Sequence, residues 1–337
     1  MIVDCDRHVA VMDYAELFTH MPQSWQKHFE RDEFVGSVRD AASHIQLTDR
    51  FGDAVRVGSE GCAEVDMALA VPHQGLTING WADQVAAKTF ITALNSWSIQ
   101  NWQAYSAGRS AILVSPYDPE WSARAITEAV SRSDRYSAVA LPLNSTLLGA
   151  NSFDPIYQAA TEADLPVVVH FSGVEGHYLG APPLSGGVHT TAFARATLMP
   201  HLAESSITSL CFGGTFEKFP GLRVLFSGFG FAWLPSLLWR LDREWRTFRH
   251  DVPWVKQPPS EYVLDSVWLS TWPVCEAAAE WASLFTSERL RSRVVFGSHD
   301  PFDGDTVDAV RDTLGESADA VLGNGGPVLA RSLGAVA

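Results

Sequence analysis

Short runs of consecutive apolar residues recur along the chain, and longer stretches with a helical repeat of apolar positions separate them. The runs lie at residues 1–5, 65–71, 111–115, 137–141, 166–170, 222–227, 266–271 and 293–297. Unbroken runs of this length are typical of strands in a parallel sheet that is buried on both faces. Eight such strands alternating with helices predict an α/β protein with a closed (β/α)8 architecture, the TIM barrel.

The pattern also predicts how the rest of the chain is organised around this barrel. We expect one domain over residues 1–337, because no repeat or linker divides the sequence. Residues 13–61 look like an insertion that covers one end of the barrel, and residues 171–189, rich in Gly and Pro, are long enough to form a lid. An open doubly wound sheet is the competing topology, but no G-x-G-x-x-G motif follows an early strand, which weakens a dinucleotide-binding interpretation.

Acidic residues and histidines stand at the ends of several predicted strands. Side chains alternate along a strand, so Asp4, Asp6 and His8 point to the same side at the end of the first one. The second, fifth and eighth strands are followed by similar residues, namely His73, His170, His299 and Asp300. A closed barrel would bring all of these side chains to one rim, where the active sites of such barrels lie.

Carboxylates and imidazoles that converge in one buried space need a cation or hydrogen bonds to offset their loss of water. A divalent metal is the interpretation that we favour, and these ligands suit zinc, or manganese or iron at a site richer in oxygen. The alternative is that the sheet simply ends where polar residues begin, and an isolated histidine is more often structural than a ligand. The joint occurrence of these residues at strands one, five and eight favours the metal.

Charge and composition exclude several classes of partner. The 24 basic and 39 acidic residues give a net charge of −15, which argues against nucleic acid or an anionic membrane surface as the partner. No apolar run approaches the ~20 residues of a membrane span, and no secretory signal begins the sequence. The four cysteines are scattered without a C-x-x-C pair, as expected of thiols in a reducing cytoplasm. We therefore expect a cytoplasmic protein that binds a small molecule.

Several longer motifs resemble those of a known family. They are Asp4-Cys5-Asp6-Arg7-His8, L-P-V-V-V-H at 165–170, F-E-K-F-P-G-L-R-V at 216–224, W-L-P at 233–235, W-R-L-D at 239–242, F-G-S at 296–298 and G-N at 323–324. Together they resemble the amidohydrolase superfamily, in the branch of aminocarboxymuconate-semialdehyde decarboxylase and the non-oxidative benzoate decarboxylases. The resemblance covers nearly the whole chain. It implies a (β/α)8 barrel with one metal at the rim, zinc or manganese, and a homodimer or homotetramer.

Carried over by position, the resemblance makes Asp6, His8 and His170 metal ligands, but two departures stand out. The branch has F-G-S-D-Y-P-H after strand eight, where this chain has F-G-S-H-D-P-F at 296–302. The expected Asp is thus His299, with Asp300 one position later, and the following His is Phe302. After strand six, relatives carry a Glu or His, and this chain has S-G-F-G at 227–230. Either His299 or Asp300 completes the metal site, or the site has lost its metal.

Three hypotheses of function follow from the resemblance. The first is metal-dependent decarboxylation of a small aromatic or unsaturated carboxylic acid, with Asp300 or His299 giving a proton to the carbon that loses CO2. The second is hydrolysis of an amide, lactone or C–C bond by metal-activated water. The third is a metal-free barrel that binds or cyclises a hydrophobic small molecule, which the apolar Gly228 and Phe302 would support. For all three, we expect the substrate to contact His73, His177, Trp272 and Phe302.

Overall fold

The computed structural model describes residues 1–11, 15–29, 64–81, 83–102, 108–171, 191–274, 278–300 and 304–330. Most of the expected insertion and, apart from Phe171, the whole of the expected lid lie outside these residues. So do His177 and Phe302, two of the expected substrate contacts. The eight strands and the other expected site residues lie within them.

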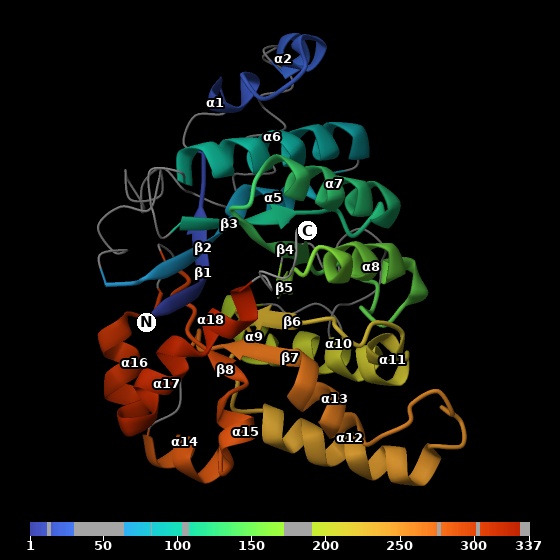
Figure 1. Ribbon diagram of the computed structural model, residues 1–337, viewed down its shortest axis with the longest axis vertical. Coiled ribbons are helices and arrows are strands. Elements are labelled where there is room, and N and C mark those ends of the chain that lie inside the picture. The colour runs from blue at the N-terminus through green and yellow to red at the C-terminus, as the bar shows by residue number, and fades with distance from the viewer. Residues whose placement is uncertain are drawn as a thin grey trace, which may run out of the picture.

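Eight parallel strands form one sheet, in the order in which they occur along the chain (Figure 1). They are β1 (Val3–Val9), β2 (Met67–Pro72), β3 (Gly108–Leu113), β4 (Tyr136–Pro142), β5 (Val167–His170), β6 (Val224–Ser227), β7 (Val267–Ser270) and β8 (Val294–Val295). Backbone hydrogen bonds then join the β8 end of the sheet to β1: Cys5 N–H donates to Phe296 O at 2.9 Å and His299 N–H to Asp6 O at 2.7 Å. The sheet is therefore closed, which confirms the predicted barrel.

Helices follow the strands and surround the barrel. The N-terminal ones are α1 (Ala15–Phe18), α2 (Gln23–Phe29), α5 (His73–Ile78), α6 (Gln84–Trp102), α7 (Pro119–Arg132), η3 (Asn151–Phe153) and α8 (Asp154–Glu162). The middle ones are α9 (Ala192–Leu198), α10 (Pro200–Phe212), α11 (Thr215–Lys218), α12 (Leu234–Phe248) and α13 (Pro259–Ser266). The last are α14 (Ala278–Leu284), α15 (Glu288–Arg291), α16 (Val307–Leu314), η4 (Gly315–Ser317), α17 (Ala318–Gly323) and α18 (Gly325–Leu329). Figure 1 shows the C-terminal helices beside β1, so both ends of the chain help to close the ring.

Two elements differ from the pattern-based expectation. The helical pattern of the sequence from Thr190 to Leu210 predicts one long helix, but the segment is divided at Met199 into α9 and α10, because Pro200 lacks an amide hydrogen and fits only the first turn of a helix. Strand β1 continues past Cys5 to Val9, because β2 and the segment after β8 supply backbone partners on both sides. Asp6 and His8 thus lie within the strand rather than after it, and the rigid sheet fixes their positions.

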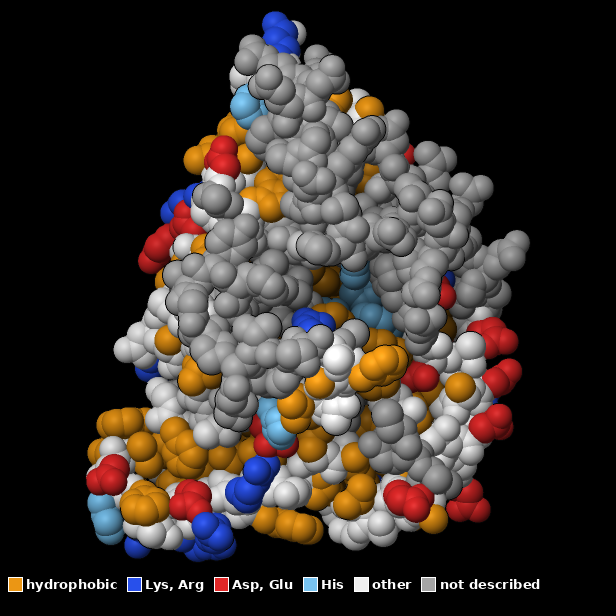
Figure 2. Space-filling model, turned by 180° about the vertical axis from the view of Figure 1, so that it is seen from behind, with side chains coloured by type: hydrophobic (Ala, Val, Ile, Leu, Met, Phe, Trp, Pro, Cys, Tyr) orange, Lys and Arg blue, Asp and Glu red, His pale blue; other side chains and the backbone are white. Residues whose placement is uncertain are grey.

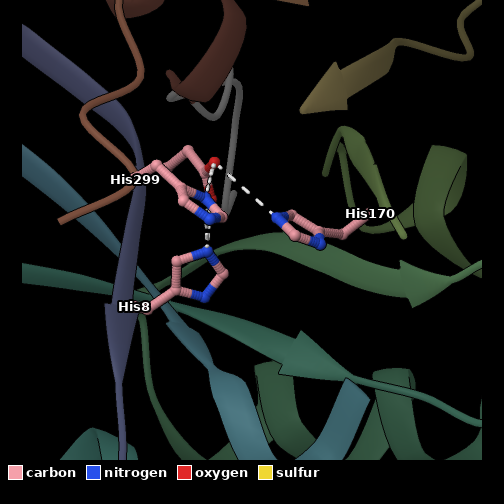
Figure 3. Close-up of side chains that lie close together, drawn as sticks. His8, His170 and His299 are labelled. Carbon is pink, nitrogen blue, oxygen red and sulfur yellow. Dashed lines mark hydrogen bonds and ion pairs between the residues drawn. The ribbon is translucent and has the colours of Figure 1, made fainter. Parts of the chain in front are cut away.

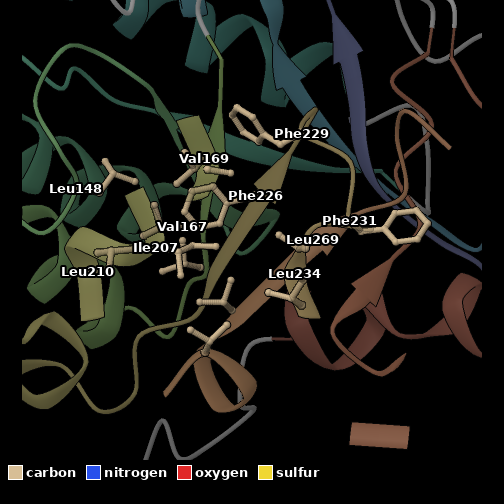
Figure 4. Packing of buried hydrophobic residues seen from close by; sticks show 14 of the residues in the cluster. Leu148, Val167, Val169, Ile207, Leu210, Phe226, Phe229, Phe231, Leu234 and Leu269 are labelled. Atoms are coloured by element: carbon tan, nitrogen blue, oxygen red, sulfur yellow. The ribbon is translucent and has the colours of Figure 1, made fainter. Parts of the chain in front are cut away.

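The alternation of side chains on β5, β6 and β7 separates the packed core from the barrel interior. Val167, Val169, Phe226 and Leu269 belong to a buried apolar cluster that includes residues of the surrounding helices, such as Ile207 (Figure 4). Their neighbours in sequence point the other way, into the barrel. At the carboxyl ends of these strands, the inward residues are His170, Ser227 and Ser270. The same packing that stabilises the barrel therefore presents polar groups at its centre.

The family-like motifs after β5 connect helices at the outside of the barrel. Glu217, from F-E-K-F-P, accepts hydrogen bonds from Lys256 Nζ at 2.6 Å and from the Tyr262 hydroxyl. Asp242, from W-R-L-D, accepts from Ser260 N–H at 2.9 Å and from Ser260 Oγ at 2.8 Å, and so caps the first turn of α13. We call these five residues the helix brace. They position α11, α12 and α13 relative to one another.

Candidate metal centre

Four side chains that the sequence places far apart meet inside the barrel. Asp6 and His8 come from β1, His170 ends β5, and His299 follows β8, and all four are buried. One nitrogen or carboxylate oxygen from each lies within 4.8 Å of the corresponding atoms of the others. Figure 3 shows the rings of the three histidines approaching one another from different strands. The barrel therefore brings side chains from strand one, strand five and the segment after strand eight together at one rim, as expected.

The distances between these atoms fit a divalent ion. His8 Nε2 lies 2.9 Å from His299 Nδ1, which lies 3.2 Å from Asp6 Oδ2. His8 Nε2 is 3.4 Å from Asp6 Oδ1, and His170 Nε2 is 3.8 Å from Asp6 Oδ2. Ligand atoms around a tetrahedral zinc at its usual bond lengths are about 3.3 Å apart. The four residues therefore have the spacing of a ligand set.

Hydrogen bonds to His170 and Asp6 point to the same use. His170 Nδ1 lies 2.7 Å from the carbonyl oxygen of Phe171, which can only accept, so Nδ1 carries the hydrogen and Nε2 faces the cluster with its lone pair. Metal-bound histidines are commonly oriented by such a bond. Asp6 Oδ2 accepts from Ser227 Oγ at 2.6 Å, whereas the buried Oδ1 has no hydrogen-bond partner among the described residues. A buried carboxylate oxygen in this state is well suited to a cation.

Burial sets the protonation states that metal binding requires. It lowers the pKa of His8 well below the usual value for histidine and lowers the pKa of His73 to about 3. Burial alone would raise the pKa of Asp6, but the charges of His8 and His170 and the hydrogen bond to His299 outweigh it and lower that pKa. A metal binds neutral imidazoles and ionised carboxylates, so little protonation energy opposes its binding here.

Two other expected site residues lie beside the cluster. His73 Nδ1 is 3.2 Å from His8 Nδ1, so His73 contacts the ring of His8 on the side away from the cluster. The carboxylate of Asp300 forms an ion pair with Arg7 at 2.5 Å and is not among the four grouped residues. His299 therefore contributes its imidazole to the cluster, whereas the carboxylate of Asp300 pairs with the buried Arg7.

Comparison with known proteins now identifies the family. The family model described as amidohydrolase matches residues 3–313. This chain belongs to the amidohydrolase family. Comparison of the sequence with curated proteins finds no match. The family match confirms the resemblance drawn from the motifs and is consistent with a metal-centred enzyme site.

Solved structures with this fold include several decarboxylases. An amidohydrolase from Mycobacterium avium subsp. paratuberculosis K-10 is 17% identical, with 99% of each chain covered and a TM-score of 0.73. The 5-carboxyvanillate decarboxylase LigW from Sphingomonas paucimobilis is 17% identical, with 97% of this chain and 98% of that chain covered and a TM-score of 0.68. A dihydroxybenzoic acid decarboxylase from Polaromonas sp. JS666, with bound manganese and the inhibitor 2-nitroresorcinol, is 16% identical, with 97% and 96% covered and a TM-score of 0.65. At these identities, the likeness establishes the shared fold.

Aromatic rings lie against the histidines of this amidohydrolase. Trp272 stacks on His299, with ring centroids 3.6 Å apart, and Phe171 lies 4.3 Å from the ring of His170. The two aromatic rings are 6.3 Å apart and nearly parallel. Figure 2 shows histidine side chains at the bottom of a hollow, with hydrophobic and basic side chains near them. Phe171 and Trp272 thus form an apolar wall beside the polar cluster.

The sequence analysis missed Phe171 and the serines of the site. Phe171 occupies space that a side chain at position 228 would need: a Cβ added to Gly228 would lie 2.5 Å from the Phe171 ring. Ser227, in the S-G-F-G segment that lacks an ionisable group, donates a hydrogen bond to the carboxylate of Asp6. The alternation of side chains on β6, which points Leu225 and Ser227 inward, could have indicated Ser227 from the sequence.

Within the part of the chain that the structure describes, every helix is too short or too polar to span a membrane.

Proposed function

We propose that this amidohydrolase is a metal-dependent decarboxylase of a small aromatic carboxylic acid. The observation that carries the proposal is the buried group of Asp6, His8, His170 and His299, with ligand atoms within 4.8 Å of one another. The aromatic wall beside it supports a planar, unsaturated substrate. Structural neighbours described as decarboxylases of substituted benzoic acids support the same class of reaction.

The four grouped residues would hold the ion. Three imidazole nitrogens and one carboxylate suit zinc, and manganese is supported by the metal described in a structural neighbour. When bound, such an ion supplies a positive charge that binds the substrate's oxygen atoms and stabilises negative charge developing during the reaction. His73 would orient His8, and the Phe171 carbonyl would orient His170, as outer partners of metal ligands do.

Decarboxylation breaks the bond between the ring carbon and the carboxyl carbon, releases CO2 and leaves an electron pair that must receive a proton. We assign the proton to the Nε2–H of His299. A neutral ring that would hold the ion through Nδ1, the nitrogen that faces Asp6 and His8, keeps its hydrogen on Nε2, and water would return the proton to the ring after the transfer. Trp272 holds the imidazole plane by stacking on it. Asp300 is the alternative donor, but its carboxylate contacts Arg7 at 2.5 Å and is not among the four grouped residues.

The same arrangement favours decarboxylation over hydrolysis. Hydrolysis needs a group that removes a proton from the attacking water, usually a carboxylate or a neutral histidine. Asp6 is the carboxylate of the cluster: its Oδ1 would bind the ion, and its Oδ2 contacts Ser227 and His299. Asp300 is paired with Arg7. Decarboxylation needs a proton donor instead, which an imidazole at position 299 can provide.

Two measurements test this proposal. Elemental analysis of the purified protein should find close to one zinc or manganese per chain, and a panel of hydroxybenzoic acids should release CO2 in the presence of that metal. Esters, amides and lactones of the same acids serve as the hydrolase control. Metal with hydrolysis of the control panel, and no CO2, would favour a hydrolase. A protein that purifies without metal and takes up neither ion would support the metal-free binding barrel.

Variants at the two candidate donors sharpen the result. Compared at equal metal content, His299→Asn should lower the rate of decarboxylation by about 100-fold or more, the contribution of a positioned general acid. Asp300→Asn should have a much smaller effect, because it removes only the partner of Arg7. The opposite order of effects would assign the proton to Asp300 instead. The homodimer or homotetramer and the cytoplasmic location expected from the sequence remain predictions, testable by light scattering and by cell fractionation.

A further inference from the structure

A second carboxylate, Asp4, is fully buried next to the metal cluster but does not belong to it. Its Oδ1 accepts hydrogen bonds from the N–H groups of Ser298 at 2.9 Å and Asp6 at 3.1 Å. Its Oδ2 accepts from Ser298 Oγ at 2.6 Å. Burying a carboxylate is costly unless several donors compensate it. Here two of the three donors belong to one residue, Ser298, which directly precedes His299.

The segment that Asp4 holds has an unusual backbone conformation. His299 has a φ of 56°, in the left-handed region that side chains other than Gly rarely adopt. Hydrogen bonds fix the backbone on both sides of it: Ser298 Oγ accepts from Asp300 N–H at 3.1 Å, and His299 N–H donates to Asp6 O at 2.7 Å. This conformation is strained for a residue that carries a side chain and persists only where the surroundings impose it.

We propose that Asp4 and Ser298 are positioning residues that hold the imidazole of His299 at the metal centre. The inference rests on the metal site of the proposed function. Asp4 ties Ser298 to β1, the strand that also carries Asp6 and His8, so one carboxylate sets the distance between ligands from the two ends of the chain. Without this pair, the segment after β8 would relax toward an ordinary conformation and withdraw the ring of His299.

A simpler role would be closure of the barrel. Backbone hydrogen bonds such as Cys5 N–H to Phe296 O already join β1 to the segment after β8, without either side chain. Closure alone predicts that loss of the Asp4–Ser298 contact destabilises the protein and weakens metal binding to all ligand sets equally. Positioning of His299 predicts a loss of affinity that requires His299 to be present. The two roles therefore differ in a double-mutant cycle.

The experiment measures Zn²⁺ and Mn²⁺ affinity of the full-length protein by calorimetry or chelator competition. Ser298→Ala, and separately Asp4→Asn, should weaken binding by about 10- to 100-fold in the wild-type background, as outer partners of ligands do. In a His299→Ala background, the same changes should alter affinity by no more than about twofold. Ser122→Ala is the matched control: it also removes a buried hydroxyl, one that donates to Ser115 O at 2.8 Å, and should leave affinity unchanged.

The outcomes separate this inference from the proposed function. Equal losses of affinity in both backgrounds, or none in the wild type, would overturn the positioning role and leave the metal centre intact. A wild-type protein that binds neither ion would overturn both. Metal binding that follows the predicted cycle, in a protein that releases no CO2 from any acid, would support the positioning pair and count against decarboxylation. Thermal unfolding of each metal-free variant reports whether a loss of affinity is a loss of fold.

Discussion

The cluster of Asp6, His8, His170 and His299 and the helix brace both bring together ionisable residues from distant parts of the chain, but their surroundings differ. In the cluster, the side chains of Asp6, His8 and His170 are 0% exposed. In the brace, Glu217 is 23% exposed and its partner Lys256 is 73% exposed. Water screens the charges of the brace more than it screens those of the cluster. A buried group of this kind costs stability unless a ligand uses it, whereas a half-exposed ion pair costs little.

The brace and the cluster also differ in how well hydrogen-bond donors match their carboxylates. In the brace, each carboxylate meets donors: Lys256 and Tyr262 bind Glu217, and both groups of Ser260 bind Asp242. In the cluster, three imidazoles face a single carboxylate, whose Oδ1 has no hydrogen-bond partner among the described residues. The motifs at 216–224 and 239–242 thus serve the arrangement of helices, whereas the motifs that contain Asp6, His8 and His170 lie in the cluster. His299 and Gly228, where the chain departs from the family motifs, lie in the cluster and beside His170, respectively.

The largest effect should come from exchanging one carboxylate in each region. Asp6→Asn removes the charge at the centre of the cluster, and we expect metal affinity to fall by more than about 100-fold and decarboxylation by about 10³-fold. Asp242→Asn is the matched change in the brace. It weakens the cap on α13 and should lower the free energy of unfolding by about 1 kcal/mol, with metal content unchanged. Calorimetric metal titration and thermal unfolding of both variants would measure this contrast.

Loss of metal from Asp242→Asn, or unchanged metal binding by Asp6→Asn, would contradict the contrast between the brace and the cluster. If Asp242→Asn lost its metal, the brace would be part of the site. If Asp6→Asn kept its full metal content and full activity, the cluster would be a structural group of hydrogen-bonded histidines. The sequence left this structural role open for each histidine considered alone.

The sequence predicted the barrel and the meeting of Asp6, His8 and His170 with either His299 or Asp300, because both follow from local rules. Apolar runs specify strands, alternation specifies faces, and parallel strands place their carboxyl ends at one rim. The sequence did not predict the pairing of Asp300 with Arg7. The direction of the backbone after Ser298 decides which of the two neighbouring side chains, His299 or Asp300, enters the cluster, and the sequence does not show that direction. That turn depends on Asp4, which lies 294 residues away.

An intermediate effect should come from Gly228, where the site meets the packed core. Gly228 has a φ of +91°, and a Cβ there would lie 2.5 Å from the ring of Phe171. We expect Gly228→Ala to lower the free energy of unfolding by about 2–4 kcal/mol, from backbone strain and displacement of Phe171 together. Gly315 has a φ of +54° and a ψ of −129° but no atom within 4 Å of an added Cβ, so Gly315→Ala should show the backbone strain alone, about 1–3 kcal/mol.

The difference between these two glycine variants isolates the packing of Phe171 beside His170. Because the Phe171 carbonyl orients His170, Gly228→Ala should also weaken metal binding several-fold, and Gly315→Ala should not. Denaturant unfolding and metal titration of both variants give the two quantities. Equal destabilisation of the two proteins, with equal metal affinity, would mean that Phe171 adjusts without disturbing the site.

The smallest effect should come from Glu217→Gln in the brace. The change removes the charge that pairs with Lys256 but keeps an amide oxygen that can accept the Tyr262 hydroxyl bond. Because Lys256 is 73% exposed, the ion pair contributes about 0–1 kcal/mol, and the loss should shrink further at high salt. Thermal unfolding in low and high salt, with metal titration as the control, measures this. A loss that is large and independent of salt would show that the Glu217 charge is not screened, and the contrast in solvent access between brace and cluster would then not account for their different roles.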